Sequence, residues 1–186
     1  TTADYQARWS VKMKTPKASG PFDISIQGHN RITLKDVLIG EVWLCAGQSN
    51  MEWAANAGIN HAKEEIAQAN HPNIRFFTVG KRTATSPQIE LSGKWEVCTP
   101  ETMSEFSAVA YFFDRKVQQE MGVPIGLVNS TWGGTPAESW MPEAAVLDNP
   151  ILAAAAAKLP KVPWGPSEPG SVFNAMISPI TAFRIA

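Results

Sequence analysis

The hydrophobic pattern changes period near residue 37, and this change constrains the fold more than any other feature of the chain. Before it, apolar and polar side chains alternate in three runs, 9–13, 22–26 and 32–34, which is typical of strands with one face in water. Residues 37–46 are instead almost continuously apolar, as in a strand buried on both faces of a parallel sheet. The pattern predicts a short antiparallel β segment over residues 1–36 and a domain of another class over 37–186.

Strands and helices alternate in the second of these segments. Apolar runs at 73–79 and 124–129 are further candidate strands. Between them, Thr102 and Glu105 fit a capping box, and Gly122 stands where a C-terminal cap belongs. The intervening helix has an apolar stripe formed by Phe106, Val109, Ala110, Phe113 and Val117. This alternation predicts an α/β domain built from βαβ units.

Composition and charge exclude several classes of function. The 186 residues carry 16 Lys and Arg against 17 Asp and Glu, so no basic surface for nucleic acid is expected. No apolar run reaches the length of a membrane-spanning helix. Cys45 and Cys98 are too few for a disulfide scaffold or a structural zinc site, and Cys45 fits a small core hydrophobe. The chain begins at Thr1, which favours a processed or trimmed product.

A first candidate loop, residues 47–52, directly follows the buried strand. Ligands of open parallel sheets bind at the carboxyl ends of strands, and Ser49 would lie there at a helix start, near backbone N–H groups that stabilise an anion. The run does not match the G-x-S-x-G elbow. Ser49 and Glu52 also fit an ordinary capping box. Gln48 and Asn50 would orient the serine or bind the acyl group, or only form turn hydrogen bonds.

A second candidate loop, residues 129–136, follows the third strand and should leave the same edge of the sheet. Its paired glycines, Gly133 and Gly134, permit close approach of backbone N–H groups to a ligand, although an ordinary glycine turn has the same pattern. Trp132 and Trp140 flank these glycines. They would line a sugar site or pack in the core.

Two long runs in these regions resemble a known family. Residues 40–53 resemble the nucleophile block of the sialate O-acetylesterase family, which belongs to the SGNH hydrolase superfamily, and residues 123–141 resemble its second block. Residues 106–113 and 173–179 are similar as well. The resemblance covers most of residues 22–182.

The resemblance implies a fold, a reaction and a set of roles. The fold would be a three-layer α/β/α flavodoxin-like parallel sheet, incomplete in this chain, with residues 1–36 as the end of an accessory β-domain. The reaction would be hydrolysis of O-acetyl esters on sialic acid, without metal or other cofactor, through an acetyl-enzyme on Ser49. The oxyanion hole would comprise the N–H groups of Ser49 and Gly134, with Gly133 as the alternative. The resemblance also implies a secretory-route location: extracellular, periplasmic or lysosomal.

The chain departs from the family in the catalytic base. The family supplies base and orienting acid from an Asp-x-x-His near the end of the esterase domain, whereas none of His29, His61 and His71 has an Asp three residues before it. Solvated surface histidines are the favoured interpretation of all three. If one did serve as base, His71 would be the first to test. We therefore expect the N-terminal part of an esterase, with the remainder on a second chain or a missing segment.

The sequence thus favours a carbohydrate O-acetylesterase with an O-acetylated sugar as its substrate. An alternative within the family is a deacetylase of acetylxylan or another polysaccharide. An alternative of another class is a non-catalytic carbohydrate-binding module, which the retained Gly-Gln-Ser-Asn run at 47–50 argues against.

Overall fold

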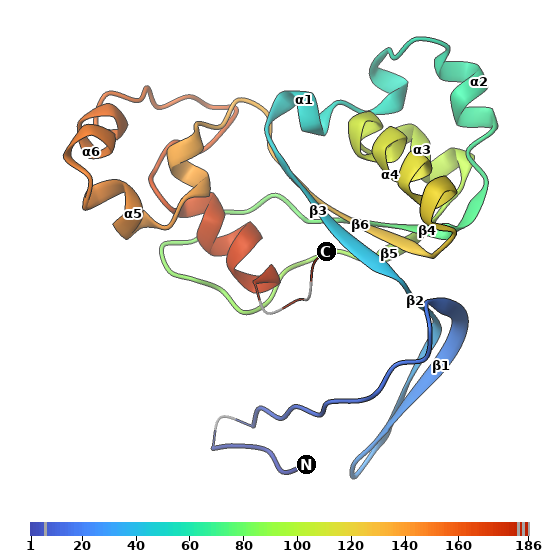
Figure 1. Ribbon diagram of the computed structural model, residues 1–186. Helices are drawn as coiled ribbons and strands as arrows, with labels where there is room; N and C mark the ends of the chain where they lie inside the picture. The colour runs from blue at the N-terminus through green and yellow to red at the C-terminus, as the bar shows by residue number, and fades with distance from the viewer. Residues whose placement is uncertain (6, 182, 184, 186) are drawn as a thin grey trace. The chain divides into compact units, whose positions relative to one another are not determined.

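A computed structural model describes residues 1–5, 7–181, 183 and 185. The chain divides into two compact units, Thr1–Gly40 and Glu41–Ala186 (Figure 1). The division falls a few residues after the predicted change at residue 37, because the strand of the first unit continues to Ile39. That the first unit is the end of a larger β-domain stays a prediction.

The first unit contains a two-stranded antiparallel sheet of β1 (Ser19–Gln27) and β2 (Arg31–Ile39). The apolar side chains of β1 alternate with exposed polar ones, as predicted, and are half-buried. The strand predicted over 9–13 is wrong: no described residue before Ser19 lies in a strand. The reason is that Trp9, Val11 and Met13 are all exposed, so their alternation buries no face.

The second unit is built on a four-stranded sheet in the order β3–β6–β4–β5. The parallel strands predicted from the apolar runs are present. They are β3 (Glu41–Gly47), β6 (Ile125–Thr131) and β4 (His71–Thr78). The single strand predicted over 37–46 is instead two strands in different sheets, since the chain bends at Gly40. The antiparallel edge strand β5 (Trp95–Cys98) was not predicted.

Helices cover both faces of this sheet, which confirms the predicted three-layer α/β/α arrangement. One layer contains α1 (Ser49–Glu52), η1 (Ala55–Ala57), α2 (Ala62–Ala67), α3 (Pro100–Glu105) and α4 (Ala108–Met121). The other contains η3 (Phe173–Ile177) and η4 (Ser178–Ile180). The remaining helices are η2 (Ala137–Trp140), α5 (Glu143–Leu147) and α6 (Pro150–Ala156).

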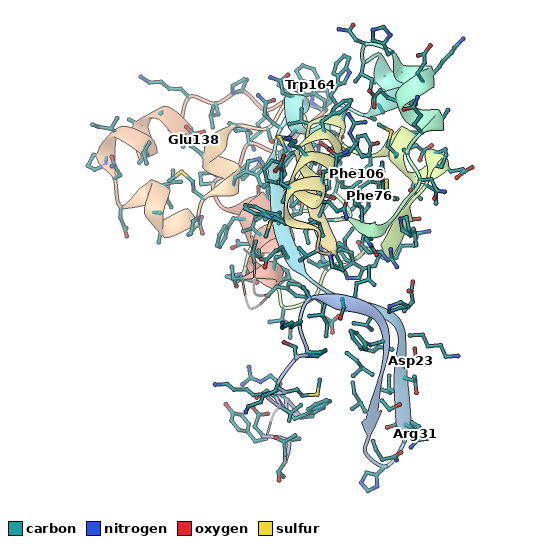
Figure 2. The ribbon with its side chains drawn as sticks, turned by 45° about the vertical axis from the view of Figure 1, so that its right-hand side comes forward. Asp23, Arg31, Phe76, Phe106, Glu138 and Trp164 are labelled. Atoms are coloured by element: carbon teal, nitrogen blue, oxygen red, sulfur yellow. The ribbon has the colours of Figure 1, made fainter. Side chains whose placement is uncertain are left out.

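The core lies in two clusters, one on each face of the sheet. Alternate residues of β3 serve opposite faces: Trp43 and Cys45 pack on the α4 side, and Val42 and Leu44 on the η3 side. On the α4 side the rings of Phe76 and Phe106 stack with centroids 3.9 Å apart (Figure 2). Cys45 is buried and unpaired, as predicted for a core hydrophobe, and burial raises the pKa of its thiol to about 11.

The helix predicted between the second and third strands is two helices. Thr99 caps α3 in a capping box with Thr102, so the box predicted for Thr102 and Glu105 is wrong; Pro100 at the first helical position favours the earlier start. Ser107 caps α4 by accepting the N–H of Ala110 at 3.2 Å. The predicted stripe is only partly buried.

The N-terminal half of α4 explains that difference. Val109 and Phe113 are exposed, whereas Tyr111 and Asp114 are fully buried, so the buried face of α4 is rotated from the predicted one. Gly122 ends the helix in the left-handed conformation with φ of +64°, as predicted. No helix in the described part of the chain is long and apolar enough to cross a membrane.

Candidate active site

The two candidate loops lie side by side at one edge of the sheet. β3 and β6 pair in parallel with Gly47 opposite Thr131, so the segments that follow them leave the sheet together. The backbone N–H of Trp132 donates to the carbonyl of Gly47 at 3.0 Å. This adjacency brings the serine of the first loop next to the glycines of the second.

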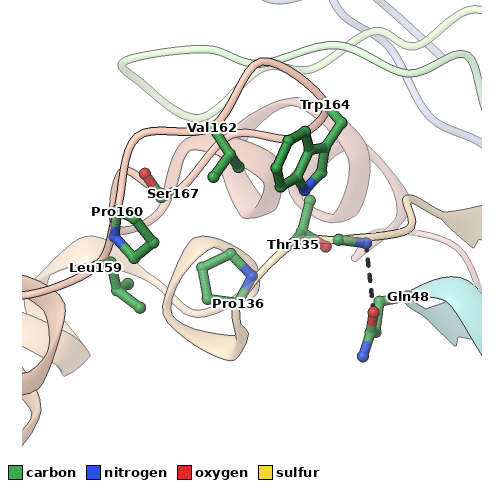
Figure 3. A pocket seen from close by; sticks show the side chains of 9 residues that line it. Gln48, Thr135, Pro136, Leu159, Pro160, Val162, Trp164 and Ser167 are labelled. Atoms are coloured by element: carbon green, nitrogen blue, oxygen red, sulfur yellow. Dashed lines mark hydrogen bonds between the residues drawn. The ribbon is translucent and has the colours of Figure 1, made fainter.

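The side-chain carbonyl of Gln48 joins the two loops. Gln48 is the N-cap of α1, and its Oε1 accepts the backbone N–H of Ser49 at 3.2 Å and the Ser49 hydroxyl at 3.1 Å. The same oxygen accepts the backbone N–H of Gly134 at 3.3 Å, dashed in Figure 3. Two backbone N–H groups from different loops therefore converge on one carbonyl oxygen beside the serine hydroxyl.

Glu52 binds the neighbouring glycine. One carboxylate oxygen accepts the backbone N–H of Gly133, and the other pairs with Lys81. The capping box considered for Ser49 and Glu52 is not formed, because Gln48 caps the helix and Glu52 reaches the other loop. Gly133 and Gly134 thus direct their N–H groups to different acceptors.

Trp132 and Trp140 use their indole N–H groups within the protein. Trp132 donates to the backbone carbonyl of Trp164 at 3.1 Å. Trp140 donates to Thr135 Oγ1 at 2.8 Å, and that hydroxyl donates to the Trp132 carbonyl at 2.6 Å. Both rings pack partly against the core cluster on the η3 side.

A pocket opens directly beside these loops (Figure 3). Its volume is about 390 Å³, and it is lined by Gln48, Gly134, Thr135, Pro136, Leu159, Pro160, Val162, Trp164 and Ser167. Sequence reasoning missed Trp164; the only signal was its place in a Pro- and Gly-rich loop. Asn50, which was singled out, is exposed and has no side-chain hydrogen bond to another described residue.

No histidine in the described chain is hydrogen-bonded to Ser49. His71 begins β4 and contacts Tyr111, with Nε2 3.2 Å from the phenol oxygen. Because β4 runs parallel to β6 and β3, His71 lies at the opposite edge of the sheet from Ser49. His71 is half-buried, whereas the sequence predicted a solvated surface residue. Burial lowers the pKa of His71, and the nearby charge of Arg115 lowers it further by a smaller amount.

Neither of the other two histidines is a described hydrogen-bond partner of Ser49. His29 lies in the turn between β1 and β2, in the first unit. His61 precedes α2 and is exposed. Within the described residues, no cluster of three or more His, Cys, Asp or Glu side chains could hold a metal ion.

Comparison with known proteins identifies the family. The model of a family of carbohydrate esterases, described as sialic acid-specific acetylesterases, matches residues 39–163. The chain belongs to this family. The match includes β3, Ser49 and the glycine loop, and it confirms the family expected from the sequence.

Individual relatives of the chain are similar to it over most of its length. Sialate O-acetylesterases of Pongo abelii and Homo sapiens are each 31% identical to it, over 92% of this chain and 35% of each relative. A carbohydrate acetylesterase from Xanthomonas citri superposes with a TM-score of 0.84 and 38% identity, over 98% of this chain and 40% of that one. The chain spans about a third of the length of the curated relatives it matches.

Proposed function

We propose that this chain supplies the nucleophile and part of the oxyanion hole of a carbohydrate O-acetylesterase that acts on O-acetylated sialic acid. The observation that carries the proposal is the convergence of the Ser49 and Gly134 N–H groups on one carbonyl oxygen, next to the Ser49 hydroxyl. An ester carbonyl has the same acceptor atom as the Gln48 amide. The substrate would displace that side chain and place its own oxygen between the two donors.

The proposed reaction has two steps. Ser49 Oγ attacks the acetyl carbonyl carbon while its proton passes to a base, and the carbonyl oxygen becomes an anion held by the two N–H groups. The tetrahedral intermediate collapses, the sugar oxygen leaves with a proton, and an acetyl-enzyme remains. Water then attacks the acetyl-enzyme by the same route and releases acetate and the free serine.

The base is proposed to come from outside residues 1–186. The described partner of the Ser49 hydroxyl is an amide oxygen, which is not basic enough to take the proton, and His71 lies at the far edge of the sheet. A histidine with its orienting carboxylate would be supplied by a further segment or a second polypeptide. We use "active enzyme" for this chain together with those residues.

The sugar is assigned from the family and its relatives. Relatives named sialate O-acetylesterases favour sialic acid, whereas the structural neighbour is named more broadly as a carbohydrate acetylesterase. Acetylxylan and other acetylated polysaccharides are therefore the second candidate substrates.

Labelling with a fluorophosphonate tests the nucleophile. The probe phosphonylates an activated serine, so peptide mapping of the active enzyme should find the adduct on Ser49. Ser49→Ala should abolish the adduct and reduce acetate release from O-acetylated sialic acid by about 10³-fold or more, while circular dichroism stays that of the wild type.

Assaying acetylxylan in parallel identifies the preferred sugar. Wild-type turnover by Ser49→Ala would overturn the assignment, and binding of both sugars without Ser49-dependent turnover would support a binding module.

A further inference from the structure

We propose that the indole ring of Trp164 is the platform on which the sugar ring of the acetylated substrate rests, so that Trp164 determines substrate specificity. The proposal rests on the function proposed above for Ser49. It concerns how the carbohydrate part of the ester is recognised.

Trp164 lies directly against the backbone that faces the reacting centre. A methyl group placed on Gly134 would come within 2.5 Å of Trp164 Cδ1 and 2.9 Å of its Nε1. The ring is therefore in van der Waals contact with the residue whose N–H points at the Gln48 oxygen. A ring bonded to an ester held at that position would reach the indole.

The backbone around Trp164 is fixed. Its carbonyl accepts the indole N–H of Trp132, and Val162 and Gly165 form an antiparallel bridge around it. Gly165 is buried, and a methyl group there would lie 3.3 Å from the Gly134 carbonyl oxygen. The backbone of residues 162–165 is therefore packed against the glycine loop, residues 129–136.

The Trp164 side chain nevertheless stays in water. It is 65% exposed, more than any of the other exposed tryptophans, Trp9, Trp53 and Trp95. A single exposed aromatic side chain is ordinary on a protein surface. Here, however, the exposed ring is held by a fixed backbone at the mouth of a pocket beside a candidate nucleophile, which is the arrangement expected of a ligand contact.

The chemistry of the pocket fits a sugar ring. Leu159, Pro160 and Val162 make its wall apolar around the indole, while Gln48 and Gly134 provide polar groups at one end. A pyranose ring has C–H faces that pack on an aromatic surface and hydroxyl groups that remain hydrated, and an amphipathic, half-open site accommodates both. A long acyl chain would leave much of its apolar surface in water beside a ring this exposed.

Kinetics on matched esters test the proposal in the active enzyme. O-acetylated sialic acid carries the sugar, ethyl acetate carries the same acyl group without a ring, and ethyl butyrate carries a longer acyl group. Trp164→Ala should raise KM for the sugar ester by about tenfold or more, with a clearly smaller effect on kcat/KM for ethyl acetate. Trp164→Phe should retain most of the affinity for the sugar ester. Trp9→Ala removes an exposed tryptophan from the first unit and should change none of these values.

Two kinetic outcomes would overturn the proposal. Equal losses on the sugar ester and ethyl acetate would show that Trp164 only supports Gly134. A gain on ethyl butyrate with an unchanged KM for the sugar ester would make Trp164 a wall of the acyl site.

A binding measurement separates this proposal from the function of Ser49. In ¹⁵N-labelled Ser49→Ala protein, titration with sialic acid should shift the indole N–H resonance of Trp164, which is assigned by its loss in Trp164→Phe. If the esterase activity did not depend on Ser49 but the Trp164 resonance still shifted, the proposed nucleophile would be wrong. The proposed role of Trp164 in binding the sugar would be retained. An unshifted resonance at saturating sugar would overturn the platform.

Discussion

The carboxylate of Glu52 accepts the backbone N–H of Gly133 and thereby joins the loop after β3 to the loop after β6. This bond occupies the Gly133 N–H and leaves the Gly134 N–H directed at the Gln48 oxygen. Glu52 therefore holds the glycine loop next to Ser49.

Removing the Glu52 carboxylate should impair turnover. Glu52→Ala leaves the Gly133 N–H without its acceptor, so the Gly134 N–H loses its fixed position. We expect kcat/KM of the active enzyme for O-acetylated sialic acid to fall by about 10- to 100-fold. Lys81→Met is the matched control, since it removes the ion pair and keeps the bond to Gly133. That pair is half-exposed and worth only about 0–1 kcal/mol. Equal losses in the two variants would show that the charge pair, not the bond to Gly133, matters.

The two glycine N–H groups should respond differently to a tetrahedral adduct. In the phosphonylated enzyme an adduct oxygen would replace Gln48 Oε1, and we expect the amide proton resonances of Ser49 and Gly134 to move downfield because they donate to a more polar acceptor. The Gly133 resonance should change little, since its donor stays on Glu52. A shift of Gly133 without one of Gly134 would make Gly133 the donor. A Gly134→Pro variant could not replace this measurement. Gly134 has a φ of +78°, which proline cannot adopt, so the variant would change the backbone as well as remove the N–H.

The sequence allowed the elements around the site to be predicted, because each rests on local patterning. The apolar runs located β3, β4 and β6, and strand-end placement put Ser49 and the glycine loop at one edge. The sequence does not show which acceptors the N–H groups of Gly133 and Gly134 have, since the acceptor for Gly133 is Glu52, 81 residues away along the chain. Trp164 was missed for a similar reason: its position depends on a bond to Trp132 across 32 residues.

Each error in the predicted fold has an identifiable physical cause. β5 has four residues, too few to show a period, and its ladder with β4 is a long-range contact. Two overlapping capping signals stand in the same segment: Thr99 with Thr102, and Thr102 with Glu105. The prediction used the second signal and so began the helix at Thr102. Pro100 decides between them in the structure.

Residues 1–186 alone should not hydrolyse acetyl esters at an enzymatic rate. A serine at its free pKa is a weak nucleophile without a neighbouring base, and the Ser49 hydroxyl has only the Gln48 oxygen as its described partner. The measurement is p-nitrophenyl acetate hydrolysis by the purified chain, with intact-mass analysis to show that no second polypeptide is present. The wild-type chain and Ser49→Ala should give the same rate. Rapid, Ser49-dependent hydrolysis by this chain would show that it contains its own base.

Asp114 should make the second unit less stable as the pH rises. Its side chain is fully buried in α4, and neither carboxylate oxygen has a hydrogen-bond partner among the described residues. Burial raises the pKa of this carboxyl from 3.8 to about 7. Between these values the folded protein holds a proton that the unfolded chain releases, so the free energy of unfolding falls as the pH rises from about 4 to about 7 and stays low above that.

Asp114→Asn isolates the effect of that charge, because an amide has nearly the shape of the protonated acid. We expect the variant to match the wild type near pH 4 and to exceed its free energy of unfolding at pH 8 by an amount on the order of a few kcal/mol. Urea unfolding followed by circular dichroism at several pH values measures the difference. Asp148→Asn is the control, since Asp148 is exposed at the end of α5 and its replacement should leave the pH profile unchanged. A constant difference between Asp114→Asn and the wild type across this pH range would show that Asp114 does not change its charge there.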